Sequence, residues 1–94
     1  MGDGEKREKQ AIPLPPVTFS TFILSLNTAA LIHLGELPNP DTNEKTVNLT
    51  LARHTIDTLD MLREKTRGNL TPDEERLLES ILYELRLRYV KLTS

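Results

Sequence analysis

The 94-residue sequence contains no cysteine and no tryptophan, and it has only two tyrosines and two phenylalanines. Without cysteine, disulfide bonds and thiolate metal sites are excluded. The four glycines lie at positions 2, 4, 35 and 68, which leaves no glycine-rich loop that could hold a phosphate group. No run of about 20 apolar residues occurs, so we expect no transmembrane helix and no membrane partner.

An excess of either charge is also missing, because 12 basic and 14 acidic residues give a net charge of −2. Proteins that bind nucleic acid through its phosphates normally carry a basic face, so this balance disfavours that class. The first ten residues are charged and polar where a secretion signal would have an apolar segment. Together with the lack of cysteine, this start predicts a soluble cytoplasmic protein.

The chain is long enough for one small domain, and its composition divides it into residues 1–16 and 17–94. Met1–Gln10 has the composition of a disordered tail. The prolines that follow impose an extended backbone up to residue 16. Pro13 and Pro16 have the P-x-x-P spacing of some peptide ligands. We favour a plainer interpretation, in which Ile12, Leu14 and Val17 of a stiff arm contact the helical domain.

The first predicted helix begins near Thr18 or Ser20, either of which can cap it, and ends at Leu34 before Gly35. Ten of its sixteen positions from Phe19 to Leu34 are apolar. They occupy an arc of roughly 220°, whereas a helix that rests on one neighbour needs about half of that width. We therefore expect protein to surround this helix, and part of that protein to come from a second chain.

Two further helices are predicted after a proline-containing loop at residues 36–43. The second runs from about Glu44 to Arg67 and ends before Gly68. The third begins at Thr71 and Pro72, where Thr71 and Glu74 have the spacing of a capping box. Because only residues 68–70 separate these helices, we expect an antiparallel hairpin.

The third helix carries two apolar stripes. The stripe that includes Leu78, Leu82 and Leu85 is expected to face the core. The other consists of Tyr83, Leu87 and Val90, at positions i, i+4 and i+7 on the opposite side. A second stripe with no partner in a three-helix domain is a candidate contact for another protein.

No catalytic or metal-binding pattern is evident. The two histidines, His33 and His54, lie on different predicted helices. His33 and Glu36 form one H-x-x-E, whereas di-iron bundles use E-x-x-H twice with further acids. The acids cluster on a solvated helix face or at a helix start, and no G-x-S-x-G motif accompanies the serines. The sequence thus predicts no enzyme, no cofactor and no metal.

Several segments resemble a bacterial family catalogued as domain of unknown function 1844. They include Phe19-Ser20-Thr21-Phe22, Leu34-Gly35-Glu36 and, as the most specific part, Lys65-Thr66-Arg67-Gly68-Asn69-Leu70-Thr71. The likeness extends from about Val17 to Val90. It implies a bacterial, helical and soluble protein, and it transfers no functional residue because the family has no established activity.

These observations predict an all-α domain of three helices that is completed by oligomerisation. The leading hypothesis is a homo-oligomeric interaction or scaffold module, with a dimer favoured and an unidentified protein partner as a variant. The expected interface comprises Phe19, Phe22, Ile23, Leu24, Leu26, Leu31, Tyr83, Leu87 and Val90. The alternative is a nucleic-acid- or ribosome-associated factor that uses basic residues of the second and third helices: Arg63, Lys65, Arg67, Arg86, Arg88 and Lys91.

Overall fold

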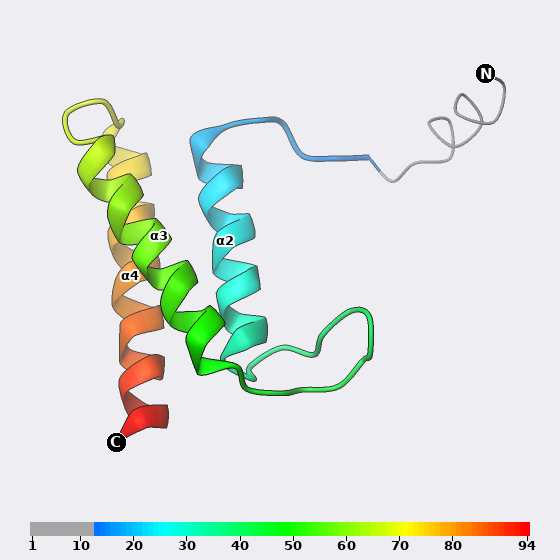
Figure 1. Ribbon diagram of the computed structural model, residues 1–94. Helices are drawn as coiled ribbons and strands as arrows, with labels where there is room; N and C mark the ends of the chain where they lie inside the picture. Colours follow the sequence, from blue (N-terminus) through cyan, green and yellow to red (C-terminus); the bar gives the residue numbers. More distant parts are fainter. Residues whose placement is uncertain (1–12) are drawn as a thin grey trace, which may run out of the picture.

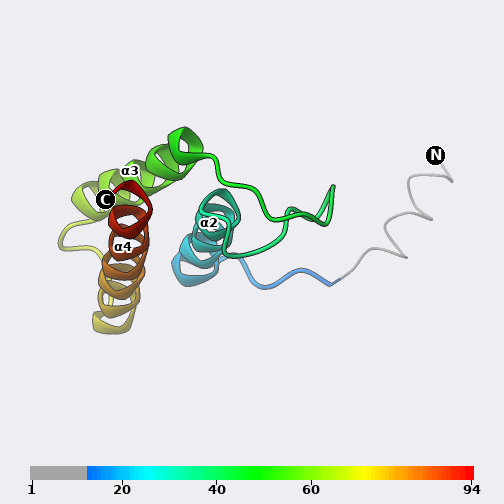
Figure 2. The same cartoon turned by 90° about the horizontal axis from the view of Figure 1, so that it is seen from below.

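The computed structural model describes residues 13–94, and this part of the chain folds into three α-helices without a β-strand. The helices are α2 (Phe19–His33), α3 (Leu49–Lys65) and α4 (Pro72–Thr93). Helix α3 runs antiparallel to both α2 and α4 (Figure 1), and the three helices form a triangle when viewed along α4 (Figure 2). The predicted all-α fold is confirmed.

Side-chain caps determine where α2 begins. The hydroxyl of Thr18 accepts a hydrogen bond from the backbone N–H of Thr21 at 3.0 Å, and the Thr21 hydroxyl accepts one from the Thr18 N–H at 3.1 Å. Both are backbone donors that the helix itself leaves without an acceptor. Of the two predicted caps, Thr18 is therefore the one used. The helix ends before Gly35, whose φ of 80° is accessible to glycine at little cost.

The start of α3 differs from the prediction, because the helix begins at Leu49 and not near Glu44. Asn48 caps it by accepting the Leu51 N–H at 3.0 Å. Asn43 has a φ of 58°, which is incompatible with a right-handed helix at that position. The Asn48 N–H also donates to the carbonyl of His33 at 2.7 Å. This bond closes the loop at residues 34–48, so the loop returns to the end of α2 before the next helix begins.

The hairpin between α3 and α4 agrees with the prediction. Gly68 has a φ of 84° in the turn. The Thr71 hydroxyl accepts the Glu74 N–H at 3.2 Å, the Glu74 carboxylate accepts the Thr71 N–H at 2.9 Å, and Pro72 occupies the first turn. The predicted capping box therefore starts α4, which leaves this long helix with a well-defined N-terminal end.

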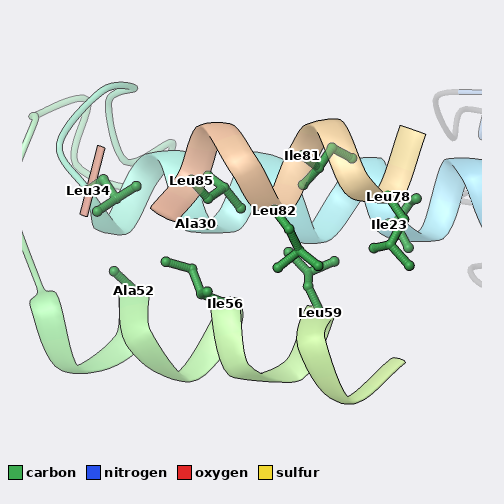
Figure 3. Close-up of a cluster of buried hydrophobic side chains, with 10 residues drawn as sticks. All are labelled: Ile23, Ala30, Leu34, Ala52, Ile56, Leu59, Leu78, Ile81, Leu82 and Leu85. Atoms are coloured by element: carbon green, nitrogen blue, oxygen red, sulfur yellow. The ribbon is translucent and has the colours of Figure 1, made fainter. Parts of the chain in front are cut away.

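Ten apolar side chains fill the core (Figure 3). They come from all three helices and from Leu34, which directly follows α2. Leu34 and Ala52 lie toward one end, Ala30, Ile56 and Leu85 near the middle, and Ile23, Leu59 and Leu78 toward the other end. Leu82 and Ile81 complete the cluster. Two of the ten are alanines, which lets α2 and α3 approach each other closely but adds little apolar area to the core.

We expected the apolar side chains of the proline-rich arm to contact the helical domain, but those in the described residues face solvent. Leu14 is 87% exposed and Val17 is fully exposed, although the Thr21 hydroxyl donates to the carbonyl of Pro16 at 2.6 Å. That bond directs residues 13–17 away from the hairpin, to the same side as the loop at residues 34–48 (Figure 2). Ile12 and the predicted disordered segment Met1–Gln10 lie outside the described residues.

Candidate interaction surface

The histidines and acids that the sequence offered for a metal site are dispersed in the structure. Residues 13–94 contain no group of three histidine or acidic side chains that could hold a metal ion. His33 is half-buried at the end of α2, His54 is exposed on α3, and Glu36 binds Arg88 at 3.2 Å. Among these residues, none of the helices is long and apolar enough to cross a membrane. The features that remain lie on the surface.

The structure divides the predicted α2 interface into buried and exposed parts. Ile23 is completely buried in the core, so it is unavailable to a second chain. Phe19, Leu26 and Leu31 are half-buried and pack against the same core. Only Phe22 and Leu24 remain substantially exposed. Much of the wide apolar arc is therefore covered by α3 and α4, which the sequence pattern alone did not reveal.

The solvent-facing side of α2 is less polar than its residue types suggest. The Thr21 hydroxyl donates to the backbone carbonyl of Pro16 at 2.6 Å. The Ser25 hydroxyl donates to the carbonyl of Phe22 at 2.6 Å, and the Thr28 hydroxyl donates to the carbonyl of Leu24 at 3.2 Å. With these donors satisfied, the threonine methyl groups, Leu24 and Pro15 line a shallow groove of about 280 Å³. Of the residues that line this groove, only Leu24 belongs to the predicted interface, because serine and threonine were counted as polar.

The second predicted stripe is exposed over its whole length. Tyr83 is 66%, Leu87 40% and Val90 56% exposed. The other two helices therefore leave this stripe open to solvent, and Glu36 of the loop at residues 34–48 reaches its edge, where it lines a groove together with Leu87. The stripe is thus a continuous apolar surface on a single straight element. Beside it, a groove of about 250 Å³ is lined by Glu36, Glu84, Leu87, Arg88, Lys91 and Leu92.

The charges that border the stripe do not all pair with each other. Glu84 and Arg88 have the i, i+4 spacing of a helix ion pair, but Arg88 binds Glu36 of the long loop instead. Among residues 13–94, neither Glu84 nor Lys91 has an ion-pair partner within 4.0 Å. Two opposite charges beside an apolar stripe are therefore left without a partner in the described chain.

Most of the basic residues named for nucleic-acid binding are held by acids. Asp60 accepts from Arg63 at 2.7 Å and from Arg86 at 2.9 Å, so it links α3 to α4. Lys65 and Lys91 have no such partner in the described part of the chain. The ion pairs of the basic set are Arg63–Asp60, Arg63–Glu79, Arg86–Asp60, Arg67–Glu64 and Arg88–Glu36.

Tyr89 and Arg53 form a contact that the sequence analysis missed. Tyr89 is half-buried against the core. Arg53 and Tyr89 line one pocket between α3 and α4, together with Ile56, Asp57 and Arg86. The proximity of Tyr89, and secondarily the charge of Asp57, raises the pKa of the Arg53 guanidinium. Arg53 and Tyr89 are 36 positions apart in the sequence, so no local sequence pattern indicated this contact.

The family model described as "Domain of unknown function (DUF1844)" matches residues 16–91. The match covers α2, α3 and all but the last two residues of α4, and it confirms the family resemblance of the segment Lys65–Thr71. No curated protein and no solved structure matches the chain.

Proposed function

The chain belongs to this family, whose description names no activity, and we propose from its surface that it is a non-catalytic protein–protein interaction module that self-associates. The observation that carries the proposal is the amount of large apolar surface left in water. Twelve large hydrophobic side chains are exposed in residues 13–94, whereas ten hydrophobic residues, two of them alanine, form the core. Single exposed hydrophobics are common on soluble proteins, so their arrangement decides the argument.

The arrangement supports association because several of these side chains are neighbours. Tyr83, Leu87 and Val90 form one stripe on α4, and Leu24 borders an apolar groove on α2. Contiguous apolar patches of this kind usually mark contacts with other proteins. Each such side chain that becomes buried would stabilise a complex by roughly 1.5–3 kcal/mol.

The ion pairs weigh against the nucleic-acid alternative. Four of its six basic residues, Arg63, Arg67, Arg86 and Arg88, already hold acids. A phosphate would have to compete with these carboxylates, and the neighbouring acids would repel it. Lys65 and Lys91 alone do not make a basic face.

Light scattering on a sizing column, over a hundredfold range of protein concentration, tests the proposal. We expect a molar mass of at least twice the 10.7 kDa of one chain at the highest concentration. The mass should fall toward that of one chain on dilution, because association through exposed patches is reversible. A mass of one chain at every concentration would contradict self-association.

A further inference from the structure

We propose that two copies of this protein pair through α4, with the helices antiparallel and a twofold axis at the level of Leu87. The inference rests on the proposed self-association and adds the surface, the partner and the register. Three features of the described residues carry it: the stripe, its exposure along α4, and the two charges beside it that have no ion-pair partner there.

The stripe has the geometry that a helix pair requires. Tyr83, Leu87 and Val90 are spaced at i, i+4 and i+7, so they line one side of α4 over two turns. With 22 residues and about 1.5 Å of rise per residue, α4 is ~33 Å long. A second helix can lie along this face because all three side chains are exposed, and Glu36 of the long loop lies only at its edge, in the groove beside Leu87.

The surface of α2 is a poorer site for a second copy. Phe22 and Leu24 are two residues apart, so at ~100° per residue they point about 160° away from each other. One partner surface cannot cover both without enclosing the helix. The groove on the intervening face is lined mostly by short side chains, those of Thr21, Ser25 and Thr28, and the core already holds Ile23.

Charge complementarity identifies the partner as a second copy of the same chain. Glu84 and Lys91 are seven residues apart, which places them on the same flank of α4, two turns from each other. The point midway between them is at the level of Leu87. A twofold axis there sets Glu84 of each copy against Lys91 of the other, so one operation satisfies all four charges. An isologous interface has this reciprocal pattern.

The same register gives Tyr83 a partner side chain. An axis midway between residues 84 and 91 brings Tyr83 of one copy to the level of residue 92 in the other, two residues from Val90. Tyr83 and Val90 both lie on the flank of the stripe that faces away from Glu84 and Lys91, so the exposed ring of Tyr83 in one copy would pack beside Val90 of the other.

Cysteine crosslinking tests the axis directly, because the chain has no cysteine of its own. Packed helices have axes ~8–10 Å apart and Cα atoms about 2.3 Å from each axis, so facing Cα atoms lie ~4–6 Å apart, within disulfide range. We expect Leu87→Cys to form a covalent dimer under mild oxidation. Leu24→Cys is the matched control, since Leu24 on α2 is 43% exposed and Leu87 is 40% exposed.

Charge reversal tests the register. Glu84→Lys or Lys91→Glu alone places like charges together twice per dimer, and we expect the dissociation constant to rise about tenfold. The double variant Glu84→Lys with Lys91→Glu restores both pairs, and its dissociation constant should return to within about threefold of the parent value. Circular dichroism of each variant should match the parent, because neither residue has an ion-pair partner within residues 13–94.

Light scattering, crosslinking and charge reversal on the full chain together separate the two proposals. An α4 pair is supported if Leu87→Cys crosslinks, Leu24→Cys does not, and the double reversal restores the dimer that the single reversals weaken. If the parent is a dimer but Leu24→Cys crosslinks instead, or the reversals have no effect, the α4 pair is wrong and self-association stands. If the parent is a monomer at every concentration, both proposals are wrong.

Discussion

At the scale of single residues, Asp60 is a carboxylate of the described surface that pairs with two arginines, one on each helix of the hairpin. Its carboxylate accepts from Arg63 of its own helix at 2.7 Å and from Arg86 of α4 at 2.9 Å. Arg63 in turn reaches Glu79 of α4 at 3.1 Å. Isolated surface ion pairs contribute little to stability, but a network in which one carboxylate holds two guanidinium groups is less easily replaced by water.

Substitution of Asp60 by asparagine keeps its shape and removes its charge. We expect Asp60→Asn to lower the free energy of unfolding by about 1–2 kcal/mol, because Arg86 loses its carboxylate and Arg63 keeps only Glu79. Urea denaturation measures the change. Asp57→Asn is the control, since the Arg53–Asp57 distance is 3.5 Å and both side chains are 63% exposed. Equal effects of the two variants would show that the network adds nothing.

At the scale of elements, the loop at residues 34–48 determines how α3 is placed against α2. The loop is anchored at its base, where Asn48 donates to the carbonyl of His33 at 2.7 Å. Next to this bond, Gly35 lies against Val47: a Cβ atom on Gly35 would be 2.8 Å from Cγ2 of Val47. The loop is therefore a closed structure that returns the chain to the helix end.

Two alanine variants separate backbone strain from this packing. Gly35 and Gly68 both have positive φ, at 80° and 84°, but nothing lies within 4 Å of a Cβ added at Gly68. We expect Gly68→Ala to cost about 1 kcal/mol, which is the strain of a left-handed alanine. Gly35→Ala should cost at least about 1 kcal/mol more, because Val47 must also move. Thermal denaturation of both variants measures the difference, and equal costs would contradict a tightly closed loop base.

At the scale of the whole molecule, the core is small and the exposed apolar surface is large. Three helices bury ten hydrophobic residues, and a chain of this size gains only marginal stability from folding alone. Association would add buried apolar area, so the proposed dimer would also stabilise each copy in proportion to protein concentration. An interface with only one helix from each copy is at the low end of known sizes, so we expect dissociation on dilution.

The charge arrangement of the whole molecule predicts weak interaction with nucleic acid. We expect a fluorescently labelled single-stranded RNA to show no polarisation change at 50 mM salt up to about 10⁻⁴ M protein, the range of non-specific binders. The reason is that the basic side chains of α3 and α4 are largely held by acids. Binding that weakened steeply with added salt would instead favour the ribosome- or nucleic-acid-associated alternative.

The sequence by itself determined the helical class, the two glycine stops and the capping box of the last helix, because these depend on residues within one turn of each other. Thr71 with Glu74 and the exposed stripe of Tyr83, Leu87 and Val90 are examples. Such patterns specify which side of a helix is apolar.

Only the tertiary structure decided which apolar residues are covered and where long loops close. Ile23 and Leu24 are adjacent and both apolar, yet the packing of α3 and α4 buries the first and leaves the second exposed. The late start of α3 depends on the bond between Asn48 and His33, and the partner of Arg88 is Glu36 rather than Glu84. Contacts between residues distant along the chain form only when the helices are in place, so no local pattern contains them.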